Sequence, residues 1–236
     1  DHALGLNPAR ASALSVLVFG GPKTMGELAA AEAVTPATMS RIVGALVELG
    51  LVRRAVDRIA AEWGGIDVLV ANAGVARPRN PFDPDAVAAV MAINFQGAVN
   101  AVGAVLPLME RQGGGRLVAV SSLAAVRGFP QGPAYAASKA AMSTYFEALR
   151  VRLRPAGIAV TIVRPGFVDT GMTAGAGRLP LVLSAERAAV IIRRGLERGR
   201  AVIDFPWPAA LAMRLVARLP NGLFDWLVGR IPPRED

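Results

Sequence analysis

Tyr135 and Lys139 form the pair of residues in this sequence with the clearest chemical capability. They lie four positions apart, so on one helix both side chains project from the same face and can meet. A phenol has an ordinary pKa of about 10, and a neighbouring ammonium favours the phenolate and lowers that pKa. Such a tyrosine can donate or accept a proton near neutral pH. The pair therefore indicates the general acid or base that carbonyl reduction or alcohol oxidation needs.

Other polar residues occur at or near the carboxyl ends of predicted strands, where they could share a site with Tyr135 and Lys139. Ser122 ends an apolar run that predicts a strand over 117–122, and Asn94 lies in an otherwise apolar helix. The turn Pro165-Gly166 directly follows another apolar run. Ligands of open α/β sheets bind at the carboxyl ends of the strands, so these residues predict one site there. Each also has a purely structural interpretation, as a strand cap, a satisfied helix amide or a turn.

Helices and strands alternate in the part of the chain that carries these residues. The predicted helices cover 55–63, 83–110, 134–154 and 184–198, and the predicted strands cover 66–70, 117–122, 159–163 and 201–205. Strands as apolar as these are typical of a parallel sheet with helices on both faces. We therefore expect an α/β domain over 55–236, built from right-handed βαβ units.

The first part of the chain has a different pattern. Thr24 and Glu27 form a capping box that predicts a helix over 25–32, and Thr35 caps a second helix that ends before Gly50. A short strand is predicted over 51–54. We therefore expect a small helix-turn-helix segment over 1–54.

Five motifs, in order and at family spacing, resemble the classical short-chain dehydrogenase/reductase family. They are D-V-L-V-A-N-A-G at 67–74, Ile93-Asn94, Ser121-Ser122, Y-A-A-S-K at 135–139 and P-G-F-V-D-T at 165–170. The resemblance covers about three quarters of the chain, from residue 55 onward. It implies a partial Rossmann-like fold, NAD or NADP as cofactor, and hydride transfer between nicotinamide and a small carbonyl or alcohol substrate. It also implies a homo-oligomer.

The resemblance assigns a role to each matching position. Tyr135 would be the acid or base, Ser122 would hold the substrate oxygen, and Lys139 would bind the ribose and lower the tyrosine pKa. Asn94 would hold a water that extends the proton relay. The residues expected to contact the cofactor are Asn72, Ala73, Gly74, Tyr135, Lys139, Pro165, Gly166, Val168 and Thr170.

The glycine-rich loop that opens the family's cofactor site is missing from this sequence. The family pattern is T-G-x-x-x-G-x-G, and the upstream glycine pair in Phe19-Gly20-Gly21-Pro22 lacks its spacing. Backbone N–H groups of that loop hold the cofactor pyrophosphate. We therefore expect the first three strands of the family fold to be absent and the strand at 66–70 to form a sheet edge.

Residues 14–54 resemble instead the winged-helix core of MarR-type transcription regulators. The motifs are M-G-E-L-A at 25–29, T-P-A-T-M-S-R at 35–41 and L-G-L-V-R-R at 49–54. By that resemblance Thr35, Ala37, Thr38 and Arg41 would face the major groove of DNA. Residues 1–54 carry five basic and four acidic side chains, a net charge of +1, so phosphate affinity should be weak. A DNA-binding regulator is the alternative hypothesis. A chimera of the two families, joined near residue 54, would explain why both patterns occur in one chain.

Composition limits the remaining possibilities. The chain has no cysteine and one histidine, His2, so we expect no metal site. No signal peptide and no uninterrupted membrane-spanning run is evident, so we expect a cytoplasmic protein. The formal net charge of +8 lies mostly downstream of residue 54, mainly as arginines scattered from Arg187 to Arg234. The apolar, arginine-containing tail after Phe205 would either pack on the domain, which we expect, or lie on a membrane surface.

Overall fold

A parallel sheet organises the part of the chain that the structure describes. The computed structural model describes residues 51–75, 82–130, 132–173 and 179–230. The helix-turn-helix predicted before residue 51 lies outside these residues. The described part confirms the predicted α/β class.

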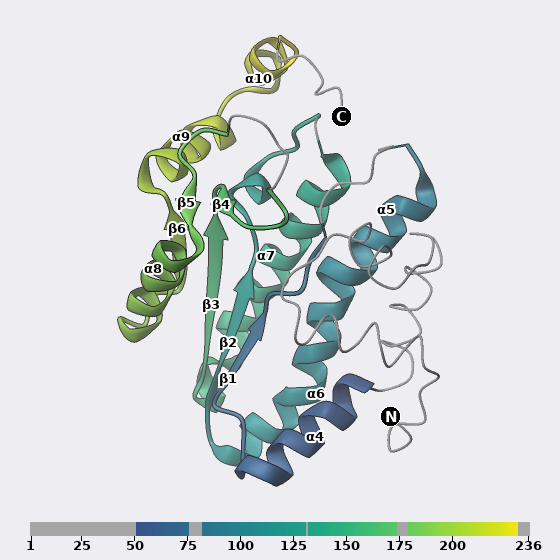
Figure 1. Cartoon of the computed structure of the whole chain (residues 1–236), viewed down its shortest axis with the longest axis vertical. Coiled ribbons are helices and arrows are strands. Elements are labelled where there is room, and N and C mark those ends of the chain that lie inside the picture. The colour runs from purple at the N-terminus through teal and green to yellow at the C-terminus, as the bar shows by residue number, and fades with distance from the viewer. Residues whose placement is uncertain (1–50, 76–81, 131, 174–178, 231–236) are drawn as a thin grey trace.

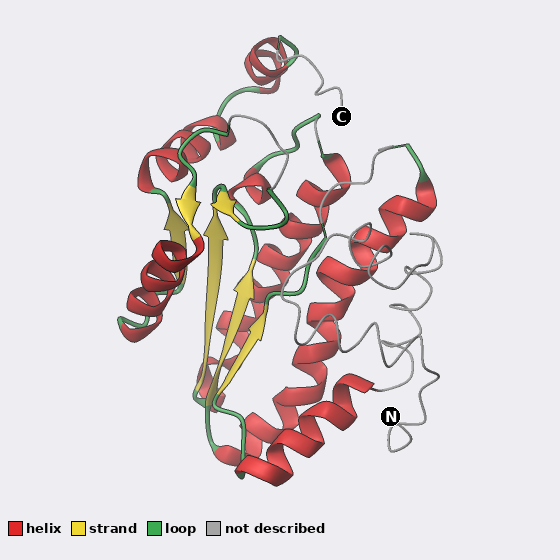
Figure 2. Cartoon of the chain, viewed as in Figure 1, coloured by secondary structure: helices red, strands yellow, loops and turns green. Residues whose placement is uncertain are grey.

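Four strands make up the main sheet. They are β1 (Val68–Ala71), β2 (Gly115–Val120), β3 (Ile158–Pro165) and β6 (Val202–Phe205). Their order in the sheet is β1-β2-β3-β6, and every neighbouring pair is parallel. A second, two-stranded sheet joins β4 (Val168–Asp169) to β5 (Leu183–Ser184). Figure 2 shows the main strands lying side by side between helices.

Helices cover both faces of this sheet. The long helices are α4 (Leu51–Trp63), α5 (Pro84–Met91), α6 (Gly97–Gln112), α7 (Pro133–Leu153), α8 (Ala185–Glu197), α9 (Trp207–Ala217) and α10 (Asn221–Val228). A π-helical segment, η2 (Ala92–Gln96), and two 3₁₀ segments, η3 (Leu123–Val126) and η4 (Arg154–Ala156), complete the set. In Figure 1, α6 and α7 lie on one face and α8 lies on the other.

Successive side chains of the central strands point alternately into two hydrophobic cores, one on each face of the sheet. Leu117 and Ala119 of β2 face the core that α6 and α7 close, while Val118 faces the core under α8. All three are buried. Strands covered on both faces are mostly apolar, which is why β2 and β3 are apolar apart from Arg116, Thr161 and Arg164.

Strand β1 is the edge of the sheet among the described strands, as predicted. Its side chains Val68 and Val70 are 47% and 53% exposed, whereas Ala71 is buried. The expectation that this apolar run is buried on both faces is therefore wrong for β1. Helix α8 packs on β3 and β6, at the opposite side of the sheet.

The strand predicted over 51–54 is helical. Helix α4 begins at Leu51, so the predicted domain boundary at 54/55 falls inside a helix. The physical reason is spacing, because Val52, Val56 and Ile59 form one apolar stripe that continues across the boundary without a glycine or proline. That stripe packs against α6.

The helix predicted over 83–110 is one continuous helical run. Asp83 caps it by accepting the N–H groups of Asp85 and Ala86 at 3.0 and 3.3 Å. Gly113, with φ 76°, ends it in the left-handed conformation.

Within the described residues this run, 84–112, is long and apolar enough to cross a membrane by length and composition alone. Its side chains Val102, Val105 and Met109 are buried in the core against the sheet. A core helix explains that composition.

Candidate functional site

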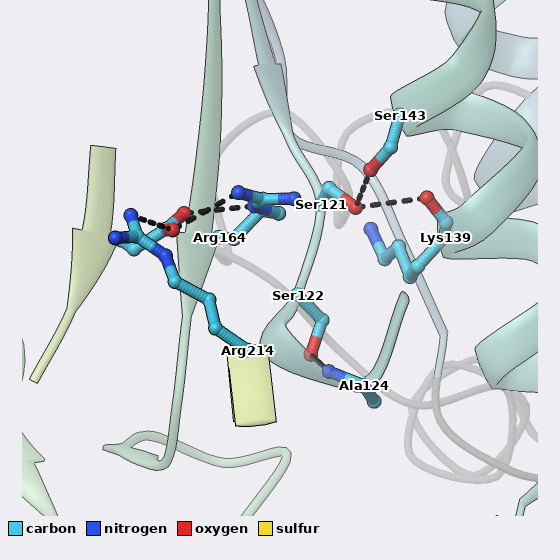
Figure 3. Close-up of polar contacts among 8 residues, drawn as sticks. Ser121, Ser122, Ala124, Lys139, Ser143, Arg164 and Arg214 are labelled. Carbon is cyan, nitrogen blue, oxygen red and sulfur yellow. Dashed lines mark hydrogen bonds and ion pairs between the residues drawn. The ribbon is translucent and has the colours of Figure 1, made fainter. Parts of the chain in front are cut away.

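The polar residues expected to form a site gather at the carboxyl edge of the sheet. Ser121 and Ser122 follow β2, and Gly74 lies in the turn after β1. Tyr135 and Lys139 lie in the first two turns of α7. Figure 3 shows Ser121 and Lys139 next to each other, with Ser122 on the same connection. Parallel strands that end at one edge bring these segments together.

The Ser122 side chain interacts with the Tyr135 phenol and lowers the pKa of that phenol. Burial acts more strongly in the other direction, and the pKa of Tyr135 is raised above its ordinary value. A phenolate loses more hydration on burial than a neutral phenol does. In the protein alone, Tyr135 is therefore a proton donor near neutral pH.

Lys139 is a buried ammonium group with one backbone partner. Its side chain is buried, with the residue 3% exposed, and Nζ donates to the carbonyl of Val120 at 2.8 Å. Burial lowers the pKa of Lys139 to about 8. Its Nζ lies 5.9 Å from the centre of the Tyr135 ring.

The predicted lowering of the tyrosine pKa by Lys139 is wrong for the protein alone. Burial of Tyr135 dominates its proton equilibrium and raises the pKa. Sequence spacing reveals which two groups meet, but it does not reveal how much water each group loses.

The serine pair after β2 has two separate functions. Ser122 caps η3 by accepting the N–H of Ala124 at 3.1 Å, so the structural interpretation of this residue also holds. Ser121 donates to the carbonyl of Lys139 at 2.8 Å, and its hydroxyl lies 2.7 Å from that of Ser143. These bonds tie the end of β2 to α7, and they set the position of Ser122 relative to Tyr135.

Asn94 is completely buried in the π-helical segment η2. Its Oδ1 accepts the N–H of Val75 at 2.7 Å, and its Nδ2 donates to the Val75 carbonyl and to Ser138 Oγ at 3.2 and 2.9 Å. Both amide hydrogens are therefore used within the protein. Only Oδ1 can still bind a water, as a hydrogen-bond acceptor. The role of Asn94 in holding a water of the proton relay stays a prediction.

Ser138 is a residue of the site that sequence reasoning missed. It is completely buried, and its hydroxyl donates to the Tyr135 carbonyl at 2.8 Å while it accepts from Asn94. It thus links the first turn of α7 to η2. The available signal was a single hydroxyl among alanines, three residues after Tyr135.

Gly74 lies where no side chain fits easily. A Cβ at this position would lie 3.2 Å from Lys139 Nζ and 3.3 Å from Asn94 Oδ1. Asn72 and Ala73, which precede it, are exposed. The turn after β1 therefore brings its backbone against the buried amine.

In the segment after β3, the hydrogen bonds and close contacts involve mainly the backbone. A Cβ on Gly166 would lie 3.1 Å from Pro206 Cδ, and the Gly166 N–H donates to the Phe205 carbonyl at 2.7 Å. The Val168 carbonyl accepts Thr173 Oγ1 at 2.7 Å and Thr170 Oγ1 at 3.4 Å. The cofactor contacts assigned to Pro165, Val168 and Thr170 stay predictions.

No group of three His, Asp or Glu side chains that could hold a metal ion occurs in the described part of the chain.

Comparison with known proteins places this geometry in context. A family model described as short chain dehydrogenase matches residues 15–178, which include every predicted catalytic position. The match begins inside the segment whose motifs resemble a winged-helix core.

Two curated relatives are similar over part of their length. An uncharacterized oxidoreductase of Myxococcus xanthus is 41% identical over 181 residues, which cover 75% of this chain and 70% of that protein. A 3-ketodihydrosphingosine reductase of Bacteroides thetaiotaomicron is 40% identical over 124 residues, which cover 52% of this chain and 46% of that protein.

A solved structure shares the fold. It is a short chain dehydrogenase from Burkholderia cenocepacia J2315 in complex with NADP, with a TM-score of 0.66 and 28% sequence identity. The similarity covers 79% of this chain and 75% of that chain.

Proposed function

Because this chain belongs to the short chain dehydrogenase family, we propose that it is an oxidoreductase that uses NAD or NADP to interconvert a carbonyl and an alcohol. The observation that carries the proposal is the convergence at the carboxyl edge of the sheet of the Ser122 hydroxyl, the Tyr135 phenol and the buried Lys139 Nζ, which lies 5.9 Å from the phenol ring. A phenol and a hydroxyl that project toward the same point can hold one substrate oxygen between them.

The residues around Lys139 fit a nicotinamide cofactor. The ammonium has three hydrogens, and one of them is donated to Val120 within the described residues. The other two are available to ribose hydroxyls, and Gly74 leaves the approach open because it lacks a side chain. Bound there, the cofactor would supply or accept the hydride.

The protein side chains would manage the oxygen and its proton. In reduction, Ser122 Oγ positions the carbonyl oxygen and Tyr135 donates a proton to it; in oxidation, Tyr135 takes that proton back. The raised pKa of Tyr135 keeps the phenol protonated, which suits the donor role. Lys139, with a pKa of about 8, can return a proton to the phenol near neutral pH.

Two finer parts of the proposal concern the first part of the chain. No T-G-x-x-x-G-x-G pattern occurs in this sequence upstream of β1, where the family carries its cofactor loop, so we expect weaker cofactor binding than a complete pyrophosphate loop provides. The MarR-like segment and its DNA-binding alternative depend on residues 1–50, which lie outside the described residues.

Cofactor titration and one matched pair of tyrosine variants test the proposal. NADH and NADPH are titrated by fluorescence, and reduction of a panel of aldehydes and ketones is measured for the wild type, Tyr135→Phe and Tyr145→Phe. We expect Tyr135→Phe to reduce kcat/KM by about 10² to 10⁴. Tyr145 is the second tyrosine of the chain and makes edge-to-face contacts with Phe95 and Phe146, so its variant should retain activity.

Equal activity of the wild type and Tyr135→Phe would contradict the assigned role. Failure to bind either nucleotide at millimolar concentration would contradict the cofactor assignment.

A further inference from the structure

Helix α9 presents its large apolar side chains to solvent. Trp207, Leu211 and Leu215 are 75%, 51% and 58% exposed. Their spacing of four residues places them in one row along the helix. The opposite side of α9 packs on the domain through the buried Ala210.

Helix α10 continues this pattern. Leu223, Trp226 and Leu227 share one face and are 46%, 56% and 44% exposed, whereas Phe224 and Val228 are buried on the other side. The fold therefore already uses a separate set of apolar residues to attach this helix. We call the six exposed residues of α9 and α10 the C-terminal apolar face: Trp207, Leu211, Leu215, Leu223, Trp226 and Leu227.

Arginines border the C-terminal apolar face. Arg214 and Arg218 lie on the exposed side of α9, where Arg214 is paired with Asp204 at 2.9 Å, and Arg230 follows α10 with its guanidinium 3.6 Å from the centre of the Trp226 ring. Within 207–230 the one acidic residue is Asp225. By helical spacing, Asp225 lies on the side of α10 opposite to Leu223 and Leu227. The face thus combines apolar side chains with positive charge.

From this arrangement we propose that the C-terminal apolar face docks on an anionic lipid surface, with its tryptophans and leucines in the interfacial layer and its arginines at the headgroups. Helices with an apolar face, tryptophans and flanking arginines bind membranes in this way. A second copy of the chain fits less well, because a symmetric contact would bring two faces that carry positive charge, each with Arg218 and Arg230, toward each other. A contiguous row of exposed large apolar residues is otherwise a liability for a protein in water.

The direction of the strands places the C-terminal apolar face and the candidate site at the same end of the molecule. The strands β1, β2 and β3 point toward the end of the molecule that carries α9 and α10 (Figure 1). Docking would therefore place the carboxyl edge of the sheet on the membrane side. The docking proposal itself does not depend on the proposed reaction.

Vesicle binding by the intact chain tests the proposal. The protein is sedimented with phosphatidylcholine vesicles that contain or lack phosphatidylserine, and tryptophan emission is recorded. We expect binding to vesicles that contain phosphatidylserine, with a blue shift that Trp207→Phe reduces and Trp63→Phe does not. Trp63 and Trp207 are both 75% exposed, so they form a matched pair.

Paired variants separate the apolar and the charged contributions. Leu211→Ser with Leu215→Ser should weaken vesicle binding about tenfold or more, whereas Val151→Ser, at a residue 73% exposed on α7, should not. Arg218→Gln should weaken binding to anionic vesicles about fivefold, whereas Arg152→Gln on α7 should not.

Two results would overturn the proposal. One is background sedimentation with both kinds of vesicle. The other is a lipid-free dimer that Leu211→Ser and Leu215→Ser abolish, since the face would then be a subunit contact.

Discussion

Burial acts on the two titratable groups at the carboxyl edge of the sheet in opposite senses. It lowers the pKa of Lys139 to about 8 and raises the pKa of Tyr135. Both shifts favour the uncharged form, because each ion loses hydration in this environment. The proposed proton transfer therefore begins from a protonated phenol and from an amine that exchanges its proton readily.

The shift at Lys139 predicts a specific pH dependence of stability. Between pH 8 and the ordinary value of 10.5, the unfolded chain binds more protons at this residue than the folded chain does. The free energy of unfolding should therefore rise with pH across this window, by at most about 1.4 kcal/mol per pH unit, and this contribution is lost as pH falls through about 8. Urea unfolding on both sides of pH 8 measures the effect.

Lys139→Met provides the comparison, since it keeps the length of the side chain and removes the titrating group. The difference in slope between the wild type and this variant isolates Lys139 from other groups. Identical slopes would show that Lys139 keeps an ordinary pKa.

Gly74→Ala tests the close approach between the turn after β1 and the buried amine. The new Cβ would lie 3.2 Å from Lys139 Nζ and 3.3 Å from Asn94 Oδ1, so one of these groups must move. We expect weaker nucleotide binding and a loss of about 1 to 3 kcal/mol in unfolding free energy. Denaturant unfolding and nucleotide titration measure both effects.

Gly103→Ala in α6 is the matched control, because nothing lies within 4 Å of its Cβ position. It should stabilise the helix by about 0.5 to 1 kcal/mol. A loss of stability at Gly103 equal to that at Gly74 would mean that crowding is not the cause.

Arg127 connects the segment after Ser122 to the C-terminal helices. Its Nη1 donates to the carbonyls of Leu219, Val216 and Ala217 at 2.6, 3.3 and 3.4 Å, and its Nη2 donates to Asn221 Oδ1 at 2.8 Å. Its guanidinium also lies 4.2 Å from the centre of the Phe224 ring. These carbonyls end α9, where a cation is favourable.

Replacement of Arg127 by Met should loosen the corner between α9 and α10. We expect a loss of about 1 to 3 kcal/mol, because hydrogen bonds from a charged group are lost together with the ring contact. Hydrogen exchange should become faster at the amides of α10 while the amides of β2 stay protected.

Arg150→Met is the control for this change. Arg150 is paired with Glu147 at 3.3 Å on the surface of α7, and such pairs contribute between about 0 and 1 kcal/mol. Unchanged exchange at α10 in Arg127→Met would mean that Phe224 and Val228 hold the helix without the arginine.

For the molecule as a whole, the sheet is covered on one face more completely than on the other. Val70 of β1 and Val118 of β2 are partners in the same register, yet Val70 is 53% exposed and Val118 is 1% exposed. The difference arises because α8 covers the side of the sheet that contains β3 and β6.

This asymmetry predicts different effects of one substitution at two paired positions. Val118→Thr should cost about 1 to 3 kcal/mol in unfolding free energy, since it buries a hydroxyl in an apolar core. Val70→Thr should change stability by about 0.5 kcal/mol or less, as is usual for surface positions. Urea unfolding of both variants measures this contrast, and similar losses would show that the outer face of β1 is covered in solution.

Much of the architecture could be predicted from local patterns. The apolar strands, the Asp83 cap and the Gly113 stop depend on the chemistry of neighbouring residues, so they are visible in the sequence. The strand predicted over 51–54 was wrong because its apolar residues also fit the helical stripe that continues to Ile59. Local spacing could not decide between these two alternatives without the contact to α6.

The sequence by itself determined the α/β class, the parallel order of strands and helices, and the set of chemically capable residues, since each depends on residue type and on short-range periodicity. Tertiary structure alone decided how buried each group is. It placed Ser138 between Asn94 and Tyr135, raised the pKa of Tyr135 against expectation, and left one face of β1 and of the C-terminal helices exposed. The hydration of a group depends on neighbours that are distant in the chain, and residue spacing alone does not identify those neighbours.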